Sequence, residues 1–339
     1  MNLCEISGGC WSEELLYGEY RKQPNALMQH VEEFRERLVP HVRAWARHGI
    51  HCSVSPWRSP SWIGLLYSHM YESAADFTRG VLEEYAQCFS TGCFELGPYR
   101  LPVASALLQM KSQIPPEFGL VAAVTHDLTM YRFPYGHPDT AKRGELNRHF
   151  LNVETMCESI VPVLQMLEPH IRVVVVRIGR IYATEEYAFP AFLRRLDEFL
   201  AVLPGAYRYA VEISNPGYLL PEYFACLHRH RAAHVLRQHA NMPLLEQVQR
   251  PDVLTSDVVV LRTDDETQEF PNRYRGKPMD AELHLGIMET VRRCISDKKM
   301  LYLDLCDRPD RPAPLSVMSL MALLDPDLAK LSPLKRKAA

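Results

Sequence analysis

The stretch RVVVVRIG, from Arg172 to Gly179, contains four consecutive valines and has the length of one strand. A continuous apolar run of this length predicts a strand that is buried on both faces of a sheet. Eight short runs of this kind occur along the chain, and each is followed by an amphipathic helical stretch. They are His51–Trp57, Gly92–Gly97, Gly119–Thr125, Arg172–Gly179, Tyr207–Ser214, Ala232–Gln238, Val258–Asp264 and Met300–Cys306.

The alternation of strands and helices predicts an α/β fold with a parallel sheet covered on both faces. Eight repeats predict a closed (β/α)8 barrel of the TIM type, in which reactive groups lie where the strands end. Barrels of this type carry many unrelated chemistries, so the topology alone names no reaction. The fold is therefore easier to predict than the function.

Composition and charge exclude several classes of protein. Hydrophobic residues make up 47% of the chain and charged residues 23%, which is ordinary for a soluble globular protein. The net charge of −3 gives no reason to expect nucleic acid or an anionic membrane as a partner. No apolar run reaches the roughly 18 residues that a membrane-spanning helix needs. The segment Met1–Cys10 lacks a basic start followed by an apolar core, so we expect a cytoplasmic protein.

The nine cysteines form no C-x-x-C pair, and their odd number favours free, mostly buried thiols over a disulfide framework. A length of 339 residues would also suit two average domains, but one barrel with an extension explains it equally well. We therefore expect a helical extension over residues 1–50, a barrel over residues 51–326 and a basic, solvated tail over residues 327–339.

The extension is predicted to be one amphipathic helix that ends near Gly49, with Pro40 as a kink or break. Its apolar residues recur every three or four positions: Leu27, Met28, Val31, Phe34, Leu38, Val42 and Trp45. We expect this face to pack across the N-terminal end of the barrel or against its outer helices. A contact between copies of the chain is the alternative.

Two stretches resemble one particular family. SPWRSPSWIG at Ser55–Gly64, followed by Tyr67, resembles a G-W-x-x-P-x-W-x-G-x-x-Y segment, and Tyr85–Phe89 leads into YRLP at Tyr99–Pro102. These segments are typical of the YecE-like family, the domain of unknown function numbered seventy-two. Further resemblances follow in order along the chain: Ala210–Glu212 with Asn215 and Pro216, Val260–Arg262, Tyr274 with Gly276, and Ala313 with Pro314. The resemblance runs from Cys52 to Leu324 and implies a TIM-type barrel of no established activity.

The chain departs from the family pattern at several strand ends. Cys93 stands where the family has a glutamate, Glu95 and Ser214 replace an asparagine and an arginine, and Asp264 replaces a histidine. Other departures are Ala123, Met130, Cys306 and Asp307. Either the pocket has been rebuilt for another ligand, or catalysis has been lost.

Glu212 and Arg262 are the strongest candidates for a working site. Each is a charged residue inside an apolar run, where burial is costly unless the charge is paired. The two runs are not neighbours, but alternate strands of a barrel contribute to the same interior layer, so the two side chains can meet. One possibility is that they form a structural ion pair. The other is that Arg262 binds an anion and Glu212 acts as a general acid or base.

Other candidates lie near the predicted strand ends. Glu95 and His126 are candidates for proton transfer, with Asp264 in support. The candidate ligand-binding residues are Trp57, Trp62, Tyr99, Arg100, Asn215, Arg177 and Asp307. The aromatic residues among them suit a flat ligand or the packing of the first loop. The loop from Tyr131 to Arg148 is interpreted as a lid over the mouth, with a plain solvated insertion as the alternative.

Three hypotheses about function follow. In the first, the barrel binds a small polar ligand, anionic or sugar-like, and hydrolyses or isomerises it. In the second, it is a catalytically silent binding or scaffold protein. In the third, a metal-dependent lyase or hydrolase uses Glu95, His126, Glu212 and Asp307. The sequence leaves open whether the chain is an enzyme, and it carries no motif of a specific cofactor.

A metal site is not predicted from the histidine-rich segment. His228, His230 and His234 have suggestive spacing, but they fall at the N-terminal end of the barrel, away from the mouth. The oligomeric state has no signal in the sequence.

Overall fold

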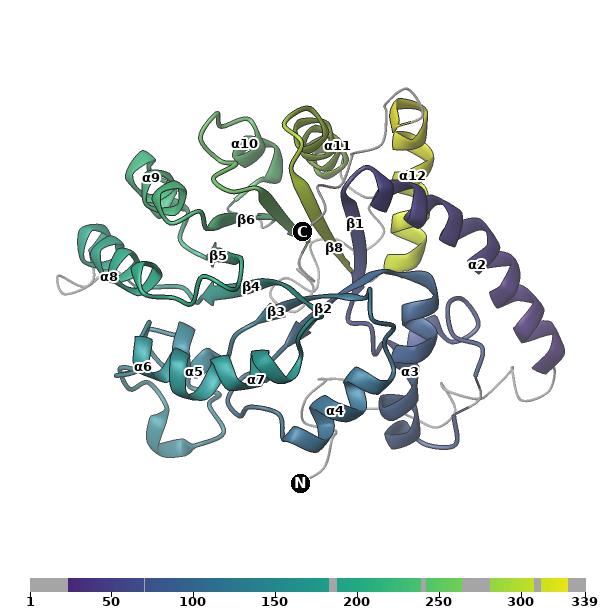
Figure 1. Ribbon diagram of the computed structural model, residues 1–339, viewed down its shortest axis with the longest axis horizontal. Coiled ribbons are helices and arrows are strands. Elements are labelled where there is room, and N and C mark those ends of the chain that lie inside the picture. Colours follow the sequence, from purple (N-terminus) through teal and green to yellow (C-terminus); the bar gives the residue numbers. More distant parts are fainter. Residues whose placement is uncertain are drawn as a thin grey trace.

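Eight parallel strands form the barrel of this protein (Figure 1). The computed structural model describes residues 24–69, 71–182, 188–238, 242–263, 281–307 and 312–328. The strands are β1 Ile50–Ser55, β2 Thr91–Glu95, β3 Gly119–Ala123, β4 Ile171–Ile178, β5 Tyr209–Ile213, β6 Ala233–Gln238, β7 Val258–Thr263 and β8 Met300–Cys306. Each lies within one or two residues of its predicted run, and the prediction of a (β/α)8 barrel is confirmed.

Parallel pairing runs through the strands in the order β1-β8-β7-β6-β5-β4-β3-β2. Between β1 and β2 the ring is joined by side chains. The Thr91 hydroxyl donates to the carbonyl of Cys52 at 3.2 Å. The hydroxyl of the buried Tyr85 accepts from the Val54 amide at 3.0 Å and lies 3.2 Å from the carbonyl of Thr91. The barrel is therefore nearly closed, with Tyr85 bridging its two end strands.

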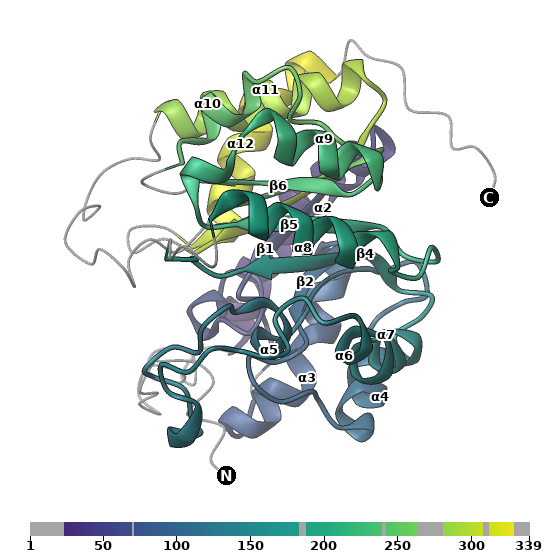
Figure 2. The same cartoon turned by 90° about the vertical axis from the view of Figure 1, so that its left-hand side faces the viewer.

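Helices surround the strands on the outside (Figures 1 and 2). They are α2 Pro24–Arg47, α3 Ala74–Cys88, α4 Ala104–Ser112, α5 His126–Thr129, α6 Val153–Thr155, α7 Val161–Met166, α8 Phe189–Ala201, α9 Pro221–Arg229, α10 Leu244–Val248, α11 Ala281–Ser296 and α12 Ala313–Leu328. In the described parts of the chain, no helix combines the length and the apolar character needed to cross a membrane.

The strand residues alternate between two cores because successive side chains of a strand point to opposite faces. Val174 and Val176 of β4 face the helices and join the large outer core. Val173 and Val175, one position away, join a second cluster inside the barrel. That inner cluster also contains Val121, Ala123, Ala210, Ala233, Val235, Val258, Val260 and Tyr302. Small aliphatic side chains, together with Tyr302, thus fill the lower part of the barrel.

The N-terminal helix α2 belongs to the outer ring. Val31, Phe34, Leu38, Val42 and Trp45 are buried along one face, as the periodicity predicted. The helix packs against β1, α3 and α12, so it lies against outer elements of the barrel. The predicted break at Pro40 does not occur, since the helix continues through it to Arg47. The buried stripe on both sides of the proline holds the helix in place despite one missing N–H.

Candidate functional site

Charged side chains replace the small aliphatic ones at the carboxyl ends of the strands. They are Arg177 on β4, Glu212 on β5, Arg237 on β6, Arg262 on β7 and Asp304 on β8. The strand register pairs Arg177 with Glu212, and pairs Arg262 with both Arg237 and Asp304. Because paired residues lie at one level of the barrel, these five residues form a single polar layer above the inner apolar cluster.

Glu212 lies at the centre of this layer and is only 1% exposed. Its Oε2 atom accepts a hydrogen bond from Nη1 of Arg262 at 2.8 Å and lies 3.4 Å from Nε of Arg177. Its Oε1 atom lies 3.7 Å from Nε of Arg237. Burial alone would raise the pKa of Glu212, but the charges of Arg262, Arg177 and Arg237 overcome it and lower the pKa to about 2. The carboxylate is therefore ionised at any ordinary pH.

Arg262 joins the two buried acids of the layer. Asp304 is 1% exposed, and its carboxylate accepts from the Ser53 hydroxyl at 2.7 Å and from the Ser55 hydroxyl at 2.8 Å. The Nε atom of Arg262 lies 3.9 Å from Oδ2 of Asp304. The predicted meeting of Glu212 and Arg262 inside the barrel therefore occurs, and Asp304 completes the arrangement.

A cavity of about 300 Å³ lies over the polar layer at the mouth. Its lining includes the indole of Trp57, the thiol of Cys93, the carboxylate of Glu95 and the guanidinium groups of Arg177 and Arg262. Glu212 is not among the lining residues. The cationic groups thus face the cavity, while the acid that pairs with both of them lies behind.

Arg58 also lines this cavity, and Glu95 makes an ion pair within it. The exposed guanidinium of Arg58 stacks on Trp57, with Cζ 4.2 Å from the ring centre. Glu95 is half exposed and accepts a hydrogen bond from Nη1 of Arg177. Burial works against the charged form of Glu95, but the Arg177 guanidinium lowers its pKa below the ordinary value. Three arginines and one carboxylate therefore line the cavity.

The aromatic groups after β2 and β3 form the neighbouring wall. The His126 ring meets Tyr99 edge-on with centroids 5.4 Å apart, and His137 meets the same tyrosine at 4.3 Å. Burial lowers the pKa of His126, and the nearby Glu95 carboxylate only partly offsets this. His126 is therefore neutral at neutral pH, as a group that accepts a proton must be.

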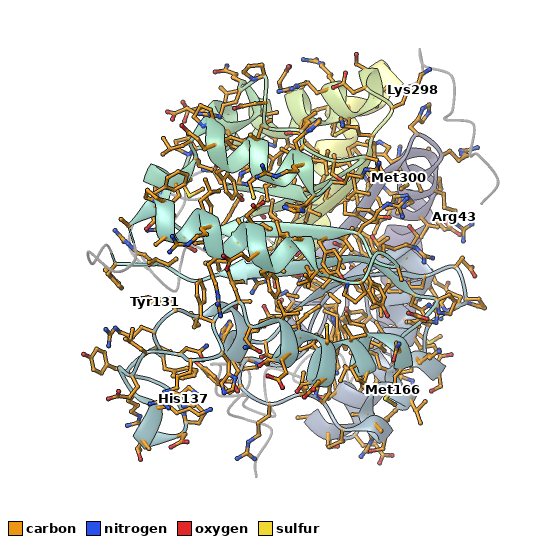
Figure 3. All side chains as sticks on the ribbon, turned by 60° about the vertical axis from the view of Figure 1, so that its left-hand side comes forward. Arg43, Tyr131, His137, Met166, Lys298 and Met300 are labelled. Carbon is orange, nitrogen blue, oxygen red and sulfur yellow. The ribbon has the colours of Figure 1, made fainter. Side chains whose placement is uncertain are left out.

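The predicted lid loop is attached beside this wall. Lys142 lies 3.7 Å from Asp127, and the Asn147 amide donates to the backbone carbonyls of Asp127 and Met130 at 2.7 and 2.8 Å. Figure 3 shows Tyr131 and His137 of this loop at the opposite side of the molecule from Lys298 and Met300, where β8 begins. The loop thus lies at the mouth, but none of its residues lines the cavity, so closure remains a prediction.

Trp62 and Asp307 lie outside the cavity. Trp62 is fully buried, and its Nε1 donates to Oδ1 of Asp307 at 2.8 Å. The same carboxylate accepts from the Ser59 hydroxyl at 2.8 Å and from the Ala313 amide at 2.7 Å. These bonds fasten the loop after β1 to the start of α12. Their places favour a structural role over the ligand-binding role expected from the sequence.

Asn215 and Arg100 also lie away from the cavity lining. The side chain of Asn215 is joined to Ile181 by two hydrogen bonds, from the Ile181 amide at 2.9 Å and to its carbonyl at 2.7 Å. Arg100 is exposed beyond the cavity lining. Asp264 lies outside the described residues, so the structure says nothing of its place.

Sequence reasoning missed two arginines of the site. Arg237 interrupts the apolar run Ala232–Gln238, which is the same signal that singled out Glu212 and Arg262. Arg58 follows β1 in a loop, where an arginine is unremarkable in sequence. In the part of the chain that the structure describes, the mouth holds no group of three acid, cysteine or histidine ligand atoms close enough for a metal ion. An arginine-lined cavity suits an anion.

Comparison with known proteins agrees with this architecture. A DUF72 family protein from Thermotoga maritima has a TM-score of 0.54 and 14% identity, and the match covers 81% of this chain and 99% of that one. A DUF72 family protein from Enterococcus faecalis has a TM-score of 0.51 and 13% identity, with 84% and 98% covered. At such identities the likeness shows the fold alone. No curated protein matches the chain.

The family itself follows from the sequence match. The family model described as "Protein of unknown function DUF72" matches residues 51–339, which cover the whole barrel except Ile50, the first residue of β1. The resemblance noted in the segments around Trp57, Tyr99, Glu212 and Arg262 is thereby confirmed. This chain belongs to the DUF72 family.

Proposed function

We propose that the mouth cavity binds a small anionic ligand through Arg177 and Arg262. The observation that carries this proposal is the lining: three guanidinium groups, those of Arg58, Arg177 and Arg262, meet a single carboxylate, Glu95. Guanidinium groups bind carboxylate and phosphate oxygens in a two-pronged geometry. Glu212 holds Arg177 and Arg262 from behind, so their positions are set before a ligand arrives.

The cavity limits the size of the ligand. About 300 Å³ is at the lower end of the range for small-molecule sites. Such a volume suits a sugar phosphate or a dicarboxylate better than a nucleotide. The indole of Trp57 offers an apolar wall for the carbon skeleton of the ligand, with the Arg58 guanidinium stacked on it.

Turnover of the ligand, by hydrolysis or isomerisation, would require groups that exchange protons at the cavity. Glu95 lines the cavity as a carboxylate, and His126 is neutral and electrostatically coupled to it. We assign proton transfer at the cavity to Glu95, and we place His126, which lies outside the cavity lining, as the neutral neighbour that would exchange protons with Glu95. Glu212 is assigned to positioning the arginines, because a buried carboxylate with a pKa of about 2 is a weak base and does not line the cavity.

Thermal unfolding with defined probes tests the binding proposal. Ribose 5-phosphate and malonate serve as anionic probes, and ribose as the neutral probe. At about one hundred times its dissociation constant, an anion that binds the folded state adds about 2.7 kcal/mol of stability. The Arg177→Gln and Arg58→Gln variants should lose this stabilisation. The matched control is Arg208→Gln, an exposed arginine that pairs with Asp257 and should leave it unchanged.

Two results would contradict the proposal. One is equal stabilisation of the wild type by ribose and by ribose 5-phosphate. The other is undiminished stabilisation by anions in both cavity variants. If Arg177→Gln does not fold, Arg58→Gln still decides, because Arg58 is exposed and makes no contact in the polar layer.

A catalytically silent binding protein is the second candidate. Two residues of the cavity lining favour it, Cys93 and Ala123. The resemblance implies that related chains have a glutamate in place of Cys93 and a lysine in place of Ala123, so two polar groups are missing here. Burial raises the pKa of the Cys93 thiol, which makes it a poor replacement for an acid. Turnover by the wild type separates the two: an enzyme converts the bound anion and loses this activity in Glu95→Gln, whereas a silent barrel binds the anion without converting it.

A further inference from the structure

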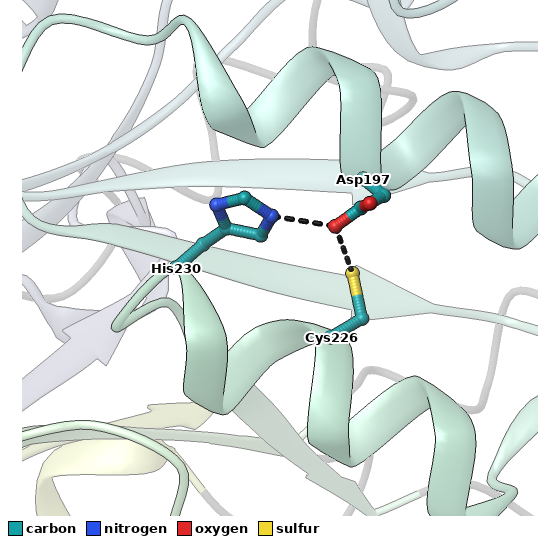
Figure 4. Close-up of side chains that lie close together, drawn as sticks. All are labelled: Asp197, Cys226 and His230. Carbon is teal, nitrogen blue, oxygen red and sulfur yellow. Dashed lines mark hydrogen bonds and ion pairs between the residues drawn. The ribbon is translucent and has the colours of Figure 1, made fainter.

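A cluster of three potential metal ligands lies on the outer helices, separate from the mouth. Asp197 is on α8, Cys226 is on α9, and His230 follows α9 directly (Figure 4). One potential ligand atom from each of the three lies within 4.8 Å of the others. None of these residues lines the mouth cavity.

Two distances in the cluster can be compared with those of a tetrahedral zinc site. Oδ1 of Asp197 lies 3.5 Å from Sγ of Cys226 and 2.6 Å from Nε2 of His230. Zinc binds these atom types at about 2.0 to 2.3 Å, so two ligands at a tetrahedral angle lie roughly 3.3 to 3.5 Å apart. The sulfur–oxygen distance already fits, and the nitrogen–oxygen distance has to open by about 0.7 Å.

The sequence spacing supports the same reading. Cys226 and His230 are four residues apart at the end of α9, so they lie on one side of that helix. The neighbouring helix α8 presents Asp197 toward them, as Figure 4 shows. A ligand from each of two packed helices would let a bound ion pin α8 to α9.

We propose that Asp197, Cys226 and His230 form a binding site for a divalent metal ion, best suited to zinc, with water as the fourth ligand. Thiolate and imidazole ligands favour zinc over magnesium or calcium. On binding, the S–H bond of Cys226 breaks, a sulfur–metal bond forms, and the proton leaves to the buffer. The proton on Nε2 of His230, which is donated to Asp197 in the free site, moves to Nδ1 if the ring is neutral or leaves to the buffer if the ring is charged. The hydrogen bond between His230 and Asp197 is thereby replaced by two bonds to the ion.

Arg229 is the competitor for this site. Its guanidinium nitrogen Nη2 lies 3.0 Å from Oδ1 of Asp197, and its side chain is 61% exposed. A bound cation would repel this guanidinium, which is free to swing into solvent. Removing the charge at Arg229 should therefore strengthen metal binding.

Cobalt titration of the full, reduced chain provides the test. Co²⁺ replaces zinc in such sites and gives a thiolate-to-cobalt charge-transfer band in the near ultraviolet. We expect this band to saturate at one equivalent and to disappear when zinc is added. Cys226→Ser should abolish the band, His230→Gln should weaken binding at least tenfold, and Arg229→Gln should tighten binding several-fold.

The controls separate this site from adventitious binding. Cys157→Ser removes an exposed cysteine outside the cluster and should leave the band unchanged, as should Arg208→Gln. The proposal is overturned if no charge-transfer band appears at saturating cobalt, or if Cys157→Ser rather than Cys226→Ser removes it. If Cys226→Ser does not fold, an unchanged affinity in both His230→Gln and Arg229→Gln also overturns it.

Discussion

Replacing Glu212 by Gln tests the electrostatic basis of the polar layer. The amide has nearly the same shape as the carboxylate, so packing around it changes little. The substitution removes a negative charge that lies within 4 Å of Arg177, Arg237 and Arg262. Arg177 keeps its pair with Glu95, and Arg262 keeps its pair with Asp304. The loss of stability should therefore be electrostatic in origin.

Two independent estimates give the size of the effect. The fall of the Glu212 pKa from its ordinary 4.5 to about 2 corresponds to roughly 3 kcal/mol of stabilisation at pH 7. Solvent screening does not reduce it much, because the side chain is 1% exposed. Removing one partner of a buried ion pair costs about 3 to 5 kcal/mol. We therefore expect Glu212→Gln to lower the free energy of unfolding by about 3 to 5 kcal/mol.

Urea unfolding at pH 7, followed by circular dichroism, measures this loss. Glu198→Gln on the exposed face of α8 is the matched control and should change stability by less than about 0.5 kcal/mol. Combining Glu212→Gln with Arg262→Met should cost less than the two single changes added together, because the charges are coupled. A loss below about 1 kcal/mol for Glu212→Gln, or strict additivity, would refute the reasoning.

Two further predictions concern stability. The buried His234 has a pKa lowered by burial from 6.5 to about 4, so stability that is present above pH 6.5 should be lost as the pH falls toward 4, by up to roughly 3 kcal/mol. His234→Gln should flatten the melting temperature between pH 6.5 and 4.5 relative to wild type, and parallel curves would contradict this. Gly97 has a φ of +90°, and an added Cβ would lie 2.2 Å from the backbone oxygen of Arg100. Gly97→Ala should therefore cost about 1 to 3 kcal/mol or more and weaken anion binding at the cavity that Gly97 lines; an unchanged melting temperature would show that the loop relaxes freely.

The strands were predictable because each carries its own local signal. A strand can be recognised from a few residues, because it is an apolar run bounded by turn residues. Eight repeats of strand and helix are compatible with few chain topologies. The same reasoning reached Glu212 and Arg262, since a charge inside an apolar run needs a partner wherever the chain places it. At Pro40 the local rule predicted a kink or a break, and the break does not occur, because the buried stripe on both sides of the proline keeps α2 continuous.

The loops were not predictable in this way. Trp62 and Asp307 were expected at the cavity, but they bond to each other across 245 positions of sequence. Nothing in either local segment indicates that contact. Tyr99 contacts both His126 and His137, and its contact with His137 depends on the path of the long loop.

The sequence by itself determined the barrel, its family and the presence of a buried acid and a buried arginine at one level. Only the tertiary structure decided that Arg177 and Arg237 converge on Glu212, that Glu212 lies behind the cavity, and that Asp197 meets Cys226 and His230. The physical reason is the distance along the sequence over which each property is determined. Strand formation follows from neighbouring residues, whereas the lining of a cavity follows from the stagger of eight strands and the path of their loops, to which the whole chain contributes.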